Sequence, residues 1–279
     1  MTGKATQTVV NRDSLGSYLE EQIVSGRFAE GSKLPSERAI AEEYGLSRPT
    51  VREALRDLVG RGLIETVPGR GAYVRRPRPG DLAGPLEAFY RRQQITPRHL
   101  VEARKMIECE AASLAASRSG RNDLEAMELA LARFDHSTDL VDRTRYDIAF
   151  HMSIVRAAHN PVIEMMYASI RSLVAQLMLR SLGDPTVSHA GVPYHREIYE
   201  AVRDGDGERA RSSMSGHLVI AERLYGDDLD RSLRGVFQRV LERLLGPGVT
   251  LDDLLEVAVE TDGDDLAAPR GATVGKRDW

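Results

Sequence analysis

The sequence predicts a mostly α-helical protein, with an N-terminal winged helix-turn-helix that carries a β-hairpin wing, joined to an all-α antiparallel helical bundle. Three observations predict this class. Residues 1–76 contain three short helical patterns followed by two β-rich runs. Proline and glycine then interrupt residues 77–96, as is typical of a linker. From residue 97 to 225 apolar residues recur at helical spacing, without strand-like alternation.

Three helices are predicted after a polar N-terminal arm. In SLGSYLEEQIVSGRF, Gly26 follows the helical pattern as a stop signal. A second helix starts at a Ser36 cap and ends at Gly45, and a third starts at a Ser47 cap and tolerates Pro49 in its first turn. The apolar face of the first helix holds Leu15, Tyr18, Leu19 and Ile23, and that of the third holds Val51, Ala54, Leu55 and Leu58.

A β-hairpin is predicted directly after the third helix. The segment LIETVPGRGAYV contains two short β-rich runs around Pro-Gly-Arg-Gly, which is a turn sequence. Residues 77–96 hold three prolines and two glycines, and we interpret them as a linker that contains a short helix. The winged helix-turn-helix is therefore expected to end near residue 76.

The second part is predicted to be a helical bundle of residues 97–225. Its predicted helices span residues 97–118, 122–135, 139–158, 161–181, 193–204 and 207–225. The breaks between them carry helix punctuation, such as SGRND, HNP, LGDP and RDGD. Asn160 before Pro161 is interpreted as a cap followed by proline at the first helical position, rather than as a ligand.

The tail, residues 226–279, holds 12 acidic and 7 basic residues. Its segment LRGVFQRVLERLL predicts an amphipathic helix that packs on the bundle or on a partner. The apolar residues in register there are Leu233, Val236, Val240, Leu241 and Leu244. VTLDDLLEVAVE favours a second short helix, and disorder is expected after about residue 261.

The charge of the chain is unevenly distributed. Residues 1–80 hold 13 basic and 10 acidic residues, or +3, and the other 199 residues hold 25 and 32, or −7. The N-terminal part is therefore the basic part, although the net charge is −4. Binding of nucleic acid follows the distribution of charge rather than its sum.

The composition excludes several protein classes. The chain has 279 residues, of which 42% are hydrophobic, and this is enough for one or two domains with real cores. One cysteine, Cys109, permits no intrachain disulfide, and we expect it to be a buried, unreactive thiol. We see no apolar run near the ~18 residues of a membrane span and no signal-peptide core, so a cytoplasmic protein is expected.

The third helix has the pattern of a DNA recognition helix. Such a helix places hydrogen-bond donors at its N-terminal turns while its other face packs on the preceding helix. Arg48 and Arg52 lie one turn apart at that end, and arginine can bond guanine O6 and N7 together. Arg38, at the start of the preceding helix, and Arg70, at the hairpin tip, are placed for phosphates or the minor groove. Taken singly, each of these arginines fits a solvated basic face equally well.

The stretch LPSERAIAEEYGLSRPTVREALRDLVGRGLIETVPGRGAYV closely resembles the DNA-binding domain of the GntR family of bacterial transcription regulators. The resemblance spans roughly residues 11–76. It implies that Arg38, Arg48 and Arg52 contact the operator, that Thr50 makes a backbone contact, and that the wing tip at Gly69 approaches the minor groove. Pro49 stands where some members carry a polar residue, so no contact is carried over to it.

A second set of candidate residues lies in the helical part. Asp147 and His151, one helical turn apart in RYDIAFHMSIVRAAHN, leave the same face of a helix. His195 and His217 lie in helices that can face this one across a bundle core. One carboxylate with three imidazoles suits Zn, Ni, Mn or a similar divalent ion. A single histidine is more often a core or surface residue, so the spacing alone leaves the choice open.

Resemblance supports the metal interpretation. LVEARKMIECEAASLAA, YDIAFHMSIVRAAHNPVIEMMY and HREIYEAVRDGDGERARSSMSGHL are similar, in order, to segments of the FCD effector domain of the FadR subfamily. The resemblance covers about residues 97–224 and implies that Asp147, His151, His195 and His217 bind a metal. It also implies that Arg104 faces a small carboxylate effector. The alternative role of Arg104 is a salt bridge with Glu108, one turn on.

These features predict a ligand-responsive transcription regulator, most often a repressor in this family, that binds a palindromic operator as a homodimer. Two other functions are conceivable for the helical part. A metal-dependent enzyme would need a general base beside the ligands, and we identify none. A pure metal sensor would not need the arginine clamp. A purely structural metal is a further alternative.

Overall fold

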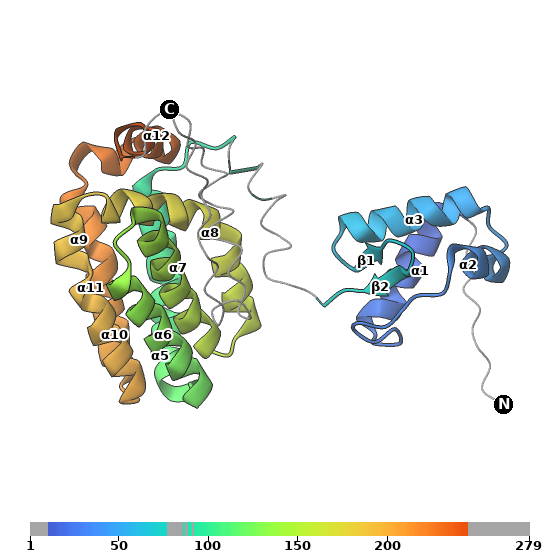
Figure 1. The fold of residues 1–279 in the computed structure, drawn as a ribbon, viewed down its shortest axis with the longest axis horizontal. Helices are drawn as coiled ribbons and strands as arrows, with labels where there is room; N and C mark the ends of the chain where they lie inside the picture. The colour runs from blue at the N-terminus through green and yellow to red at the C-terminus, as the bar shows by residue number, and fades with distance from the viewer. Residues whose placement is uncertain (1–10, 77–85, 87–88, 91, 245–279) are drawn as a thin grey trace, which may run out of the picture. The chain divides into compact units, whose positions relative to one another are not determined.

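The computed structural model describes residues 11–76, 86, 89–90 and 92–244 (Figure 1). These residues form two compact units, which meet in the sequence between Asp81 and Leu82, inside the predicted linker. The predicted N-terminal arm, most of the linker, the second tail helix and the segment after residue 261 lie outside the described residues.

The N-terminal unit is a winged helix-turn-helix, as predicted. Its elements are α1 (Arg12–Val24), α2 (Glu37–Tyr44), α3 (Arg48–Gly60), β1 (Ile64–Val67) and β2 (Gly71–Val74). Ser36 accepts a hydrogen bond from the Ala39 backbone N–H and so caps α2, which ends at Gly45 with φ of 65°. Ser47 caps α3 in the same way. Leu15, Val51 and Leu58 are fully buried between the helices.

The wing is a two-stranded antiparallel hairpin in which Ile64 faces Val74 and Val67 faces Gly71. Gly69, in the turn, has φ of 72°, a conformation that favours glycine. The segment before α2 adds to the outer edge of β2, where the Leu34 N–H donates to the Ala72 carbonyl at 2.9 Å. This third segment was not predicted.

The second unit is an all-α bundle, as predicted. Its elements are α5 (Pro97–Arg118), α6 (Arg121–His136), α7 (Leu140–Ala157), α8 (Pro161–Leu182), α9 (Pro185–Gly191), α10 (Pro193–Arg203), α11 (Gly207–Leu224), η2 (Gly226–Asp230) and α12 (Leu233–Leu244). Asn160 accepts hydrogen bonds from the Val162 and Ile163 N–H groups, so its structural role as a cap is confirmed.

Helix α9 is a correction, because the segment was expected to be a break. Its seven residues are too few to show helical periodicity. Asp184 accepts from the Thr186 N–H, and Pro185 occupies the first turn, so the sequence did carry a start signal.

Helix α8 requires a second correction. It was expected that no apolar run would be long enough for a membrane span, but α8 has the length and apolar composition to cross one. Half of that stretch is buried in the bundle, where Tyr167 and Val174 are fully enclosed. Burial in a helical core accounts for the apolar character of this helix.

The first part of the tail packs on the bundle. Helix α12 lies beside α8 (Figure 1), where buried Phe237 contacts Leu179. At the first residue of α12, the Leu233 N–H donates to the Ile95 carbonyl at 2.8 Å. Arg98 donates to both carboxylate oxygens of Asp230, at 2.7 and 2.8 Å. The tail therefore holds the start of α5 and Ile95, two residues before that helix.

Candidate functional site

The first candidate site is the exposed face of α3. Buried Val51, Leu55 and Leu58 fix the opposite face, which leaves Arg48 and Arg52 exposed. The Ser47 cap also holds Thr50, whose hydroxyl lies 2.8 Å from that of Ser47. The N-terminal turns of α3 therefore present basic side chains on a firmly packed helix.

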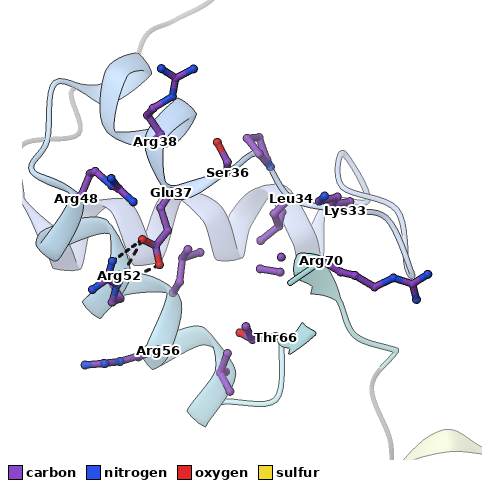
Figure 2. Close-up of a pocket in the computed structure, with 15 residues that line it drawn as sticks. Lys33, Leu34, Ser36, Glu37, Arg38, Arg48, Arg52, Arg56, Thr66 and Arg70 are labelled. Carbon is purple, nitrogen blue, oxygen red and sulfur yellow. Dashed lines mark hydrogen bonds and ion pairs between the residues drawn. The ribbon is translucent and has the colours of Figure 1, made fainter. Parts of the chain in front are cut away.

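These side chains border a groove of about 520 Å³ between α2, α3 and the hairpin (Figure 2). Its basic residues are Lys33, Arg38, Arg48, Arg52, Arg56 and Arg70. Sequence reasoning named four of the six and missed Lys33 and Arg56. Arg56 could have been found, because it lies one turn beyond Arg52 on the same face of α3. A groove with this excess of cations suits a polyanion such as the phosphate backbone of DNA.

One carboxylate lies among these cations. Glu37 accepts hydrogen bonds from Arg52 Nη2 at 2.9 Å and from Arg52 Nε at 3.2 Å (Figure 2). The hydrogen bonds from Arg52 hold the pKa of Glu37 below its ordinary value. Arg38 makes a looser pair with Glu42, at 3.7 Å. Arg52 is therefore held by its neighbour, while Arg38 is 77% exposed in its side chain.

The second candidate site brings together the four predicted metal ligands. Asp147 and His151 come from α7, His195 from the first turn of α10 and His217 from α11. Asp147 Oδ1 lies 3.1 Å from His195 Nε2 and 3.7 Å from His151 Nε2. One nitrogen of each histidine lies within 4.8 Å of the others. Asp147, His151 and His195 are buried, and His217 is partly buried.

Hydrogen bonds to the outer nitrogens orient two of these histidines. His151 Nδ1 donates to Glu108, and His217 Nδ1 donates to the Gly191 carbonyl at 3.1 Å. Nε2 of each ring then carries the lone pair, and that of His151 lies 3.7 Å from Asp147 Oδ1. Outer partners of this kind commonly fix the tautomer of a metal-binding histidine. Helix α9, absent from the predicted elements, thus supplies one of these partners.

Several buried polar atoms in the cluster lack a hydrogen-bond partner among the described residues. They include Asp147 Oδ1, His151 Nε2 and His195 Nε2. An unsatisfied buried polar group costs about 1–3 kcal/mol, so three such atoms, with both nitrogens within 3.7 Å of Asp147 Oδ1, need a common explanation. One carboxylate oxygen and imidazole nitrogens are the donors that a divalent transition metal takes, so the residues fit such an ion.

The electrostatics of the cluster favour this donor set. Burial alone would raise the pKa of Asp147, but His195 and His151 hold it below the ordinary range. Burial, followed by the proximity of His195 and His151, lowers the pKa of His217 well below its usual value. Asp147 is therefore ionised and His217 neutral, which are the forms that bind metals.

Arg104 lies next to the cluster and makes the salt bridge that was its alternative role. Its Nε donates to Glu108 Oε1 at 2.5 Å, and its side chain is only 6% exposed. Burial alone would raise the pKa of Glu108, but Arg104 and His151 lower it to about 2. Arg104 also lines a cavity of about 40 Å³ together with Asp147, His195 and His217. The salt bridge with Glu108 therefore does not prevent Arg104 from lining the cavity in which a carboxylate effector is expected.

Sequence reasoning did not assign functional roles to two buried residues at this site. Glu108 contacts both Arg104 and His151, and its only sequence signal was its position one turn after Arg104. Tyr167 is fully buried, and its hydroxyl has no partner within the described part of the chain. No local sequence pattern marks Tyr167, which is one of many buried residues of α8.

Cys109 has a structural role. It is 8% exposed, and burial raises its pKa to about 11. Its thiol is therefore protonated and unreactive at neutral pH, as expected from its position in an apolar helix.

Comparison with known proteins gives consistent results for both units. Residues 11–74 match the model for bacterial regulatory proteins of the gntR family, and residues 99–219 match the model for the FCD domain. The chain is 31% identical to the HTH-type transcriptional regulator LutR of Bacillus subtilis (strain 168), over 72% of this chain and 94% of that protein. It is also 31% identical to the galactonate operon transcriptional repressor of Escherichia coli (strain K12), over 74% and 93%.

A solved structure shows the same fold. The Streptococcus agalactiae GntR protein superposes with a TM-score of 0.62 and covers 76% of this chain and 99% of its own. Its sequence identity is 23%, so this likeness concerns the fold alone.

Proposed function

Because the chain belongs to the GntR family of bacterial transcription regulators and carries an FCD domain, it is a DNA-binding regulator rather than an enzyme, and we propose that a small carboxylate bound beside a divalent metal controls its affinity for DNA. The observation that carries this proposal is the buried cluster of Asp147 and three histidines, with its unpartnered donor atoms and Arg104 beside it.

On the DNA side, the proposed base and phosphate contacts come from α2, α3 and the hairpin. The residues are Arg38, Arg48, Thr50, Arg52, Gly69 and Arg70. Arg48 and Arg52 would read base edges in the major groove, and the hairpin tip would reach the minor groove. We propose that two copies of the chain bind a palindromic operator in the cytoplasm, because a dimer of recognition helices matches a twofold DNA site.

The charge of the buried site supports a metal and a carboxylate together. Arg104, Glu108 and Asp147 contribute one positive and two negative charges, which leaves −1 when the histidines are neutral. A divalent cation changes this to +1, and a monocarboxylate then brings it to zero. Since an unbalanced buried charge is costly, each of the two ligands favours the other.

The proposed roles of the residues follow from this balance. Asp147, His151, His195 and His217 would hold the ion, which is Zn, Ni or Mn by its donors. When bound, the metal supplies a Lewis-acid position for an oxygen of the effector. Arg104 would hold the carboxylate through the guanidinium nitrogens that Glu108 does not fully occupy. The cavity of about 40 Å³ admits only a few atoms as it stands, which favours a small acid.

One relative supports both this ligand class and repression. It is named for the operon of galactonate, which is a hydroxy carboxylate, and is a repressor. We propose that this chain is also a repressor and that its effector weakens its binding to the operator. The bound carboxylate would favour one arrangement of the bundle over another, and DNA affinity would change by the difference in binding free energy.

The test is a thermal-shift measurement with a panel of small hydroxy acids, sugar acids and dicarboxylates, repeated after chelation. His151→Ala removes one proposed ligand, and His136→Ala, at an exposed histidine of α6, is the matched control. A carboxylate should raise the melting temperature of the wild-type and His136→Ala proteins only when they contain metal. If chelation destabilises the protein while no carboxylate stabilises it, the metal is structural. If metal alone releases DNA, the protein is a metal sensor.

A further inference from the structure

Glu108 lies between the candidate metal cluster and the candidate carboxylate clamp. Its side chain is completely buried. One oxygen accepts from Arg104 Nε at 2.5 Å, and the other accepts from His151 Nδ1 and lies 3.3 Å from Arg104 Nη2. A single carboxylate therefore contacts both a proposed metal ligand from α7 and the proposed clamp from α5.

The contact with His151 prepares that side chain for a metal. Since Nδ1–H donates to Glu108, the lone pair of His151 is on Nε2, the buried atom that has no partner among the described residues. Loss of such an outer partner typically lowers metal affinity by about 10- to 100-fold, because the ring is no longer held in the required tautomer and orientation. Glu108 also adds a negative charge close to the site of the cation.

The contact with Arg104 has the opposite consequence for a carboxylate. Arg104 can hold an incoming carboxylate only through nitrogens that Glu108 leaves available, and Glu108 already takes Nε. The negative charge of Glu108 also repels a second carboxylate in the same buried space. Removing that charge would leave the metal-loaded site at +2 before the effector binds, rather than +1.

We propose that Glu108 is a positioning residue that strengthens metal binding through His151 and restrains carboxylate binding through Arg104. This inference rests on the proposed function, since it assigns a role toward the same two ligands. It makes the affinity for the effector a compromise, in which the residue that secures the metal also weakens the hold on the carboxylate. Loss of Glu108 should therefore change the two affinities in opposite directions.

The experiment compares Glu108→Gln with Glu110→Gln. Glu110 lies on the same helix and pairs with Arg211 at 2.6 Å, but its side chain is 45% exposed. In both variants a glutamate of α5 loses the negative charge that it contributes to an ion pair. Zinc affinity is measured by competition with a coloured chelator, and lactate and acetate affinities are measured by calorimetry on the zinc-saturated protein. These two acids are small enough to suit the cavity.

In Glu108→Gln, zinc affinity should fall by about 10- to 100-fold. The affinity of the zinc-saturated protein for lactate or acetate should rise on the order of tenfold, the usual worth of one charged hydrogen bond. Glu110→Gln should change neither. A merely structural role for Glu108 would lower both affinities together, and that result, like no change in either, would overturn the proposal.

Glu108→Gln leaves Arg104 buried without its partner, so the variant can fail to fold. In that case Arg104→Met is compared with Arg104→Met/Glu108→Gln, in which no buried charge is stranded. The second change should still lower zinc affinity, and an unchanged affinity would overturn the role toward His151. If the wild-type protein binds zinc but none of the panel of acids, the proposed carboxylate sensing fails, while the zinc comparison still decides the role of Glu108.

Discussion

Replacing Glu37 by Gln should increase the affinity of the protein for DNA of any sequence. Glu37 holds Arg52 by contacts of 2.9–3.3 Å. On DNA without the operator sequence, Arg52 is expected to bind a phosphate rather than a base edge, and it must leave or share these contacts to do so. The Arg52 and Glu37 side chains are 49% and 32% exposed, so the pair contributes little, as is usual for a surface salt bridge. Its loss should therefore tighten binding up to about fivefold for each subunit bound.

The salt dependence gives a second measure of the same change. If Arg52 neutralises a phosphate in place of Glu37, one more counterion is released. The slope of log binding constant against log salt should then steepen by about 0.9 per subunit. Fluorescence anisotropy with a labelled duplex of arbitrary sequence, over a range of salt concentrations, measures both quantities without knowledge of the operator.

Glu42→Gln is the matched control for this prediction. Glu42 lies on the same helix and pairs with Arg38, but at 3.7 Å and with both side chains mostly exposed. It should shift affinity less than Glu37→Gln does, because Arg38 is already nearly free. Equal shifts in affinity and slope for the two variants would refute the reasoning, since net charge alone would then explain both.

Three further predictions concern the helical unit. In Gly216→Ala the new Cβ would lie 2.7 Å from Tyr194 Cε1 and should displace that ring beside the histidine cluster, so a titration should show a lower zinc affinity. In Gly235→Ala the new Cβ meets no atom within 4 Å, and thermal melts should show a gain in stability of up to about 1 kcal/mol. Asp184→Ala removes the cap of α9 and should cost about 1 kcal/mol. Burial alone raises the pKa of Asp184, but its ion-paired arginine and backbone N–H groups lower it below the ordinary value. The stability that Asp184 contributes to the protein should therefore be present at neutral pH and be lost as the pH falls through the folded-state pKa. Denaturant melts at a series of pH values measure this loss. Because burial raises the pKa of Cys109 to about 11, iodoacetamide should label it slowly at neutral pH until the protein is unfolded, as mass spectrometry would show.

Local signals predicted much of the fold. The caps at Ser36, Ser47 and Asn160 act over three residues, so their effect is written in the adjacent sequence. The turn at Gly69 and the apolar face of α3 are equally local. Helix α9 was missed because seven residues do not complete a repeating pattern, although Asp-Pro marked its start.

The candidate site depends on contacts that local patterns do not contain. Glu108 and His151 are 43 residues apart, and only the packing of α5 on α7 brings them together. Resemblance grouped the metal-ligand candidates in advance, but it gave no role to Glu108 or Tyr167. The salt bridge of Arg104 was predictable from its one-turn spacing, whereas its place on a cavity wall was not.

The packing of the tail bears on how this protein should be shortened. The match to the FCD model stops at residue 219, yet several buried apolar side chains follow it. These include Tyr225, Leu229, Leu233, Val236 and Phe237. A fragment cut at the end of the match would lose them, expose Leu179 to water, and leave Ile95 and Arg98 without their partners. The buried surface therefore indicates that the smallest helical fragment able to fold on its own extends through α12, beyond the end of the family match.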